Sequence, residues 1–115
     1  MITLWHNPRC SKSRQTLAIL EASGTAVTVR RYLEDPPSLA ELEAARSALG
    51  CRPIKMMRSN EAQFKELGLR KDSDDGQLMK AMADAPILIE RPIAFKGTKA
   101  IIGRPPEAVN DLLSE

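Results

Sequence analysis

The stretch "ITLWHNPRCSKSRQTLAILEASGTAVTVRRY", residues 2 to 32, contains the pattern that decides the fold. It opens with a short apolar run at residues 2–5, which is typical of a strand. It closes at residues 27–32, where β-branched residues alternate with others, a pattern that is also typical of a strand. Between them a helical pattern begins around Cys10 and ends before Gly24, a natural C-cap. A strand, a helix and a strand at this spacing predict a βαβ unit whose two strands are parallel.

The middle of the chain is mostly helical in pattern. Its clearest helix begins where Ser38 and Glu41 form a capping box, and it closes at Gly50. Two further helices are expected, one at 60–67 with Asn60 as its N-cap and one at about 75–84.

The C-terminal part returns to strand patterns. Residues 91–95 and 99–102 flank a turn and predict an antiparallel hairpin, and a short helix follows, opened by Pro105 and Pro106.

The order of elements predicts one α/β domain over residues 1–115. We expect a mixed β-sheet flanked by helices, built from a βαβ half at 1–34 and a ββα half at 86–115, with a mostly helical insertion at 36–85 between them.

Composition narrows the possible partners and the compartment. The 17 basic and 15 acidic residues leave a formal net charge of +2, too near balance for a protein whose main partner is a nucleic acid. The N-terminus has no signal-peptide pattern and the chain has no long apolar run, so we expect a cytoplasmic protein that does not bind a membrane. One histidine and no paired ligand spacing argue against a metal site, and no bound cofactor is expected.

Cys10 is the residue whose setting points to chemistry. A thiol at the start of a helix faces unpaired backbone N–H groups and the positive end of the helix dipole, which lower its pKa. The same N–H groups, with the hydroxyls of Ser11 and Ser13, would also form an anion site beside it. His6 either favours the thiolate or merely caps nearby backbone.

The alternative is that Cys10 packs only as a small hydrophobic residue. Cys51 has no comparable setting and is expected to be structural. Because the motif at Cys10 reads Cys-x-x-Ser, ending at Ser13, it has no second thiol and excludes a dithiol cycle within the motif. No role can be assigned to the basic side chains of Arg9 and Lys12.

Three arginines stand at predicted element junctions. Arg58 precedes a helix, and Arg91 and Arg104 each precede a proline, where the backbone is held extended. From spacing alone they are candidates only, since most arginines are solvated surface residues.

Taken together, these residues resemble the glutaredoxin-coupled arsenate reductase family, a thioredoxin-like (glutaredoxin-like) fold with a helical insertion. The resemblance is carried in order by "HNPRCSKSRQTL" at 6–17, "YLEDPPS" at 32–38, "MMRSNE" at 56–61, "LGL" at 67–69, "PILIERPI" at 86–93 and "GRPPE" at 103–107. It implies that Cys10 is the nucleophile, that Arg58, Arg91 and Arg104 bind the oxyanion, and that Pro92 is a cis-proline facing the site.

The resemblance also implies the reaction and its partners. Cys10 would attack arsenate, glutathione would act as co-substrate on the adduct, and glutaredoxin would remove the glutathione as arsenite leaves. An external thiol would then supply the sulfur that the motif lacks.

Two other functions remain open. A monothiol glutathione-dependent oxidoreductase acting on protein mixed disulfides would need Cys10 but not three arginines. A redox-sensing transcriptional regulator of the same fold family would typically use Cys-x-x-Cys, and Ser13 argues against that switch.

Overall fold

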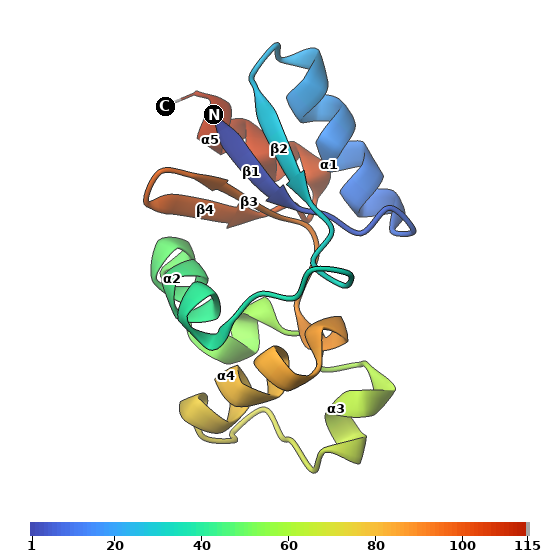
Figure 1. Cartoon of the computed structure of the whole chain (residues 1–115), viewed down its shortest axis with the longest axis vertical. Coiled ribbons are helices and arrows are strands. Elements are labelled where there is room, and N and C mark those ends of the chain that lie inside the picture. The colour runs from blue at the N-terminus through green and yellow to red at the C-terminus, as the bar shows by residue number, and fades with distance from the viewer. Residues whose placement is uncertain (115) are drawn as a thin grey trace. The chain divides into compact units, whose positions relative to one another are not determined.

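Four short strands form one mixed sheet in the computed structural model, which describes residues 1–114. They are β1 (Ile2–Trp5), β2 (Val27–Arg30), β3 (Ile93–Lys96) and β4 (Lys99–Ile102), and they lie in the order β2-β1-β3-β4 (Figure 1). β1 and β2 run parallel, whereas β3 runs antiparallel to both β1 and β4. The predicted parallel pair, hairpin and mixed sheet are confirmed.

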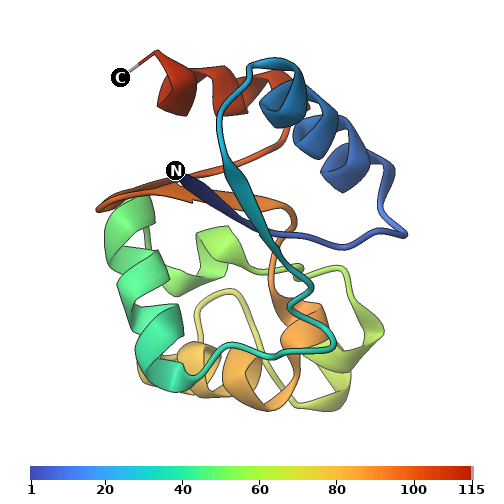
Figure 2. The same ribbon diagram turned by 45° about the horizontal axis from the view of Figure 1, so that its top comes forward.

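Helices α1 (Ser11–Ala22) and α5 (Asn110–Leu113) cover one face of this sheet, as Figures 1 and 2 show. The 3-10 helix Pro106–Val109 leads into α5. Alternate residues of a strand point to the same face, so β1 sends two apolar side chains toward these helices. The core between sheet and helices consists of Ile2, Leu4, Leu20, Ala94, Val109 and Leu112.

The chain divides into two compact units. The sheet unit comprises Met1–Asp35 and the chain from Arg91 onward, and the helical unit comprises Pro36–Glu90. Residues 86–90 fall in the helical unit, where the backbone of Ile89 bridges that of Met57. The single-domain organisation stays a prediction.

The helical unit contains α2 (Leu39–Leu49), α3 (Ala62–Glu66) and α4 (Asp75–Asp84), with 3-10 helices at Pro53–Met56 and Pro86–Leu88. All three predicted α-helices are present. None of the helices formed by residues 1–114 is long and apolar enough to cross a membrane.

The capping box of α2 is confirmed. The Ser38 hydroxyl accepts from the Glu41 N–H (3.1 Å), while the Ser38 N–H donates to the Glu41 carboxylate (2.9 Å), and Gly50 ends the helix with φ of 66°.

At α3 the predicted cap was wrong. Glu61, not Asn60, is the N-cap residue. The Glu61 N–H donates to the Arg58 carbonyl (3.1 Å), so residues 58–61 form a turn and the helix begins after it.

Gly103 lies where the chain leaving β4 passes close to α1. A methyl group on its Cα would stand 2.6 Å from Thr16 Oγ1 and 2.8 Å from Pro92 Cγ, both closer than van der Waals contact. Its N–H also donates to the Pro92 carbonyl (2.9 Å). Only glycine therefore allows this approach without displacing α1 or the segment before β3.

The Gly103→Ala variant is expected to lower the free energy of unfolding by about 1–3 kcal/mol, the usual cost of overpacking. Urea unfolding measures it. Thr16→Ala removes one of the two obstructing side chains, so the double variant should lose less than the sum of the single losses. Additive losses, or a Gly103→Ala variant as stable as the wild type, would contradict the steric explanation.

Candidate active site

Cys10 is the N-cap residue of α1, and its backbone is extended while the helix starts at the next residue. Its N–H donates to the Asn7 carbonyl (3.0 Å), and its carbonyl accepts from the Arg14 N–H (3.0 Å). A turn therefore delivers the chain from β1 into α1 and leaves the thiol at the amino end of the helix. The side chain is buried and forms no disulfide.

The surroundings of this thiol favour its ionised form. Burial alone would raise the pKa of Cys10, and it is the largest single influence. The backbone N–H of Ser13, the charge of Arg91, the backbone N–H of Lys12 and the charge of Arg104 all act the other way. Together they outweigh burial, so the pKa of Cys10 lies below its ordinary value.

Arg104 is the cation that touches the thiol. Its Nη2 donates to Cys10 Sγ at 3.6 Å, and its Nε donates to the Arg91 carbonyl at 2.8 Å. The second bond fixes the plane of the guanidinium, and the first places one end of it on the sulfur. The peptide bonds Arg91–Pro92 and Arg104–Pro105 are both cis, as the family resemblance implied for Pro92.

The sheet unit thus brings together Cys10, Arg91 and Arg104, which lie far apart in the sequence. A thiolate beside two guanidinium groups can attack an electrophilic centre whose oxygens are negatively charged, because the same cations neutralise those oxygens.

Arg58 lies in the helical unit. Its Nη1 is 3.0 Å from a carboxylate oxygen of Glu61, and its N–H donates to the Leu88 carbonyl (2.8 Å). Both of these contacts lie within the helical unit. A role of Arg58 in binding the oxyanion stays a prediction.

His6 and Ser13 form a buried hydrogen-bonded pair. His6 Nδ1 and Ser13 Oγ are 2.7 Å apart, and the same hydroxyl accepts from the Asn7 N–H (3.0 Å). Burial, with the charges of Arg31 and Arg14, lowers the pKa of His6, so the ring is neutral at pH 7. His6 thus adds no positive charge near the thiol; it binds the side chain of the residue whose backbone N–H favours the thiolate.

The hydroxyl of Ser13 is not the anion ligand that we expected. Its side chain is fully buried, and its hydroxyl is bonded to the His6 ring and to the Asn7 N–H. The contribution of Ser13 to Cys10 comes from its backbone instead.

Three residues that pack around α1 were not predicted from the sequence. Arg14 donates from Nη1 to the Pro8 carbonyl (2.9 Å) and so ties α1 to the loop before Cys10. Thr16 and Gly103 make the close approach described above. Of the three, only Gly103 could have been noticed in the sequence, because a glycine at a strand often marks a close approach of the backbone to another element.

Cys51 lies in the helical unit, where burial raises its pKa despite the charge of Arg46. The thiolate of Cys51 is therefore less favoured than that of an ordinary cysteine, and its structural role stays a prediction. No cluster of three or more potential metal ligands occurs among residues 1–114.

The rate of Cys10 alkylation by iodoacetamide should rise with pH with a midpoint below that of an ordinary cysteine thiol. The reason is that the lowered pKa makes thiolate available at lower pH. Mass spectrometry of the modified peptide separates Cys10 from Cys51. Arg104→Ala should raise the midpoint, and a midpoint at or above that of a free thiol would contradict the geometry.

Comparisons with known proteins match nearly the whole chain. The sequence model of the ArsC family matches residues 5–112. The chain is similar to an arsenate reductase of Neisseria meningitidis serogroup A, with 45% identity over 114 residues that cover 97% of each chain. It is also similar to the uncharacterised protein YfgD of Escherichia coli, at 43% identity over 97% of this chain and 96% of the other. The solved structure of an arsenate reductase from Vibrio cholerae superposes with a TM-score of 0.92 at 46% identity, covering 96% of this chain and 95% of that one. Because these similarities extend over nearly the whole chain, the protein belongs to the ArsC family and has its thioredoxin-like fold.

Proposed function

We propose that this protein is an arsenate reductase that uses glutathione and glutaredoxin as its electron donors. The observation that carries the proposal is the contact between Arg104 Nη2 and Cys10 Sγ (3.6 Å), since it joins a nucleophile to a group that can hold an oxyanion. The lowered pKa of Cys10 and the names of the relatives support the same activity.

The reaction would begin when the Cys10 thiolate attacks the arsenic of arsenate and one oxygen leaves as water. Arg91 and Arg104 would stabilise the charge on the remaining oxygens, and Arg58 is proposed as the third ligand. Glutathione would then bind to the arsenic of the Cys10 adduct through its sulfur, releasing a second water.

Reduction follows when a glutaredoxin thiolate attacks the sulfur of this glutathione. A mixed disulfide forms between glutaredoxin and glutathione, and the electron pair of the broken arsenic–sulfur bond stays on arsenic, which becomes As(III). Hydrolysis of the remaining bond to Cys10 releases arsenite and restores the thiol. Both reducing sulfurs come from outside, so the site needs no second cysteine. We place this activity in the cytoplasm, where thiols are kept reduced.

The decisive assay follows arsenite formation from arsenate with glutathione and glutaredoxin together and with each omitted. The proposal expects turnover only when both are present. Turnover with thioredoxin alone would show that thioredoxin, and not glutathione with glutaredoxin, is the electron donor. Reduction of a glutathionylated peptide without any arsenate turnover would favour the monothiol oxidoreductase.

A further inference from the structure

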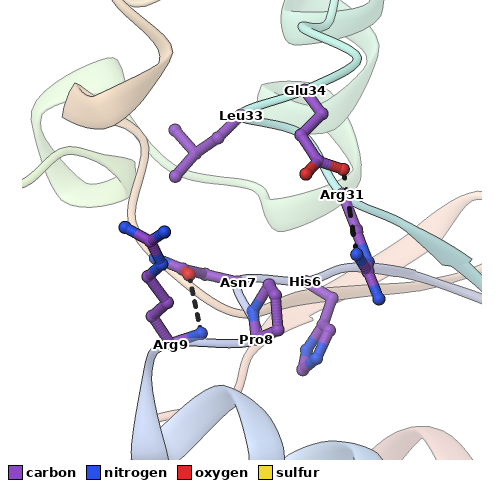
Figure 3. A pocket seen from close by; sticks show the side chains of 7 residues that line it. All are labelled: His6, Asn7, Pro8, Arg9, Arg31, Leu33 and Glu34. Atoms are coloured by element: carbon purple, nitrogen blue, oxygen red, sulfur yellow. Dashed lines mark hydrogen bonds and ion pairs between the residues drawn. The ribbon is translucent and has the colours of Figure 1, made fainter.

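A cavity of about 230 Å³ opens in the sheet unit beside the loop that carries Cys10 (Figure 3). Pro8 and Arg9 of that loop form part of its wall, and Arg31, Leu33 and Glu34 of the segment after β2 form the rest, together with His6 and Asn7. Neither Arg91 nor Arg104 lines it, so it is distinct from the proposed ligands of the oxyanion in that unit.

The walls carry three kinds of chemistry. Arg31 and Glu34 form a loose ion pair, with 3.9 Å between Nη1 and a carboxylate oxygen, and both side chains are mostly exposed. Leu33 is 43% exposed and supplies an apolar surface. Figure 3 shows the Arg9 side chain extending along the loop toward Leu33.

Two arginines line this cavity, and Arg9, unlike Arg31, is not paired with a carboxylate among residues 1–114. Its backbone N–H donates to Asn7 Oδ1 (3.0 Å), which holds the start of the side chain in place. Within residues 1–114, however, its guanidinium has no hydrogen-bond or ion-pair partner. A planar guanidinium beside an apolar wall fits a carboxylate attached to a small flexible molecule.

We propose that this cavity binds glutathione, with Arg9 holding one of its carboxylates and the Arg31–Glu34 pair facing its other charged groups. The inference rests on the proposed function, because it names the place where the thiol co-substrate docks. Arg9 directly precedes Cys10 in the chain. In glutathione the glycine directly follows the cysteine, so the glycyl carboxylate lies only about one residue length, roughly 4–5 Å, beyond the cysteine Cα. A carboxylate held by Arg9, on the loop that carries Cys10, therefore keeps the glutathione thiol near that loop.

The test measures disulfide exchange at Cys10, which needs no arsenate. The Cys10 thiolate attacks one sulfur of oxidised glutathione, forms a mixed disulfide and releases one glutathione thiolate. Its rate constant is compared with that for bis(2-hydroxyethyl) disulfide, which has no carboxylate, and mass spectrometry locates the product on Cys10. Arg9→Ala should lower the rate with oxidised glutathione at least about five-fold and the rate with the neutral disulfide less than two-fold. The rate of Arg9→Lys with oxidised glutathione should lie between those of the wild type and Arg9→Ala.

Lys12→Ala is the matched control. It removes the same charge two positions beyond Cys10, keeps the backbone N–H, and lies outside the cavity. The ratio of the two rate constants should change less than two-fold in this variant. If the ratio of the rate with oxidised glutathione to that with the neutral disulfide fell equally in Arg9→Ala and Lys12→Ala, the effect would be a general electrostatic one. The assignment of the cavity to glutathione would then be wrong.

The two proposals fail in different ways. If arsenate is not reduced but Arg9→Ala still loses its preference for oxidised glutathione, the proposed function is wrong and the cavity stands. If arsenate is reduced with glutathione while Arg9→Ala leaves both this preference and the KM for glutathione unchanged, the cavity assignment is wrong and the function stands.

Discussion

The Cys10→Ser variant is expected to lose arsenate reduction by at least about four orders of magnitude while retaining its fold. Serine has nearly the same size, but its hydroxyl does not ionise near pH 7, so it cannot replace the thiolate that the lowered pKa of Cys10 favours. Arsenite release measures activity, and circular dichroism with urea unfolding shows that the fold is unchanged.

Cys51→Ser is the control for this variant. Its thiol has a raised pKa and belongs to the helical unit, so most of the activity should remain. An equal loss from both substitutions would indicate an internal disulfide cycle between Cys10 and Cys51, and the external thiol donors would then have to be abandoned.

Arg104→Ala should reduce kcat/KM for arsenate by about 30- to 1000-fold, which corresponds to roughly 2–4 kcal/mol of transition-state stabilisation. It removes both the donor on Cys10 Sγ and the charge that lowers the pKa of the thiol. The loss of kcat/KM in Arg91→Ala should fall in the same range. The Arg58→Ala variant tests whether the helical unit supplies the third ligand of the oxyanion.

Lysine at position 104 separates charge from geometry. It keeps the positive charge but lacks the planar fork, which in arginine donates to Cys10 Sγ and the Arg91 carbonyl at once. An intermediate rate is expected for Arg104→Lys, because part of the effect is orientation. Full recovery would show that only the electrostatic field matters.

The same arginine variants distinguish the rival activity. Reduction of a glutathionylated peptide should fall much less than arsenate turnover in Arg91→Ala. That substrate has no oxyanion at the reacting centre, so it loses only the contribution of Arg91 to the lowered pKa of Cys10. If arsenate turnover also survived in all three alanine variants while Cys10 stayed essential, the arginines would not form the oxyanion site.

Local features of this protein could be predicted from the sequence because neighbouring residues decide them. The strands at 2–5 and 99–102 follow from short apolar runs, and the helix after Ser38 follows from a cap that closes within three residues. The thiol at the amino end of α1 was predicted for the same reason, since a helix start is a local signal. The roles of the arginines, by contrast, came from family resemblance.

The tertiary structure alone decided what depends on contacts between distant parts of the chain. Arg104 reaches Cys10 across 94 positions, and Gly103 is confined by Thr16 and Pro92, contacts that no periodicity encodes. The bond of the Ser13 hydroxyl to His6 spans only seven positions, but it also depends on how the end of β1 meets α1 and has no sequence signal. Periodicity reports which face of an element is buried, whereas the partner of a buried polar group or a close backbone approach is set by packing between elements.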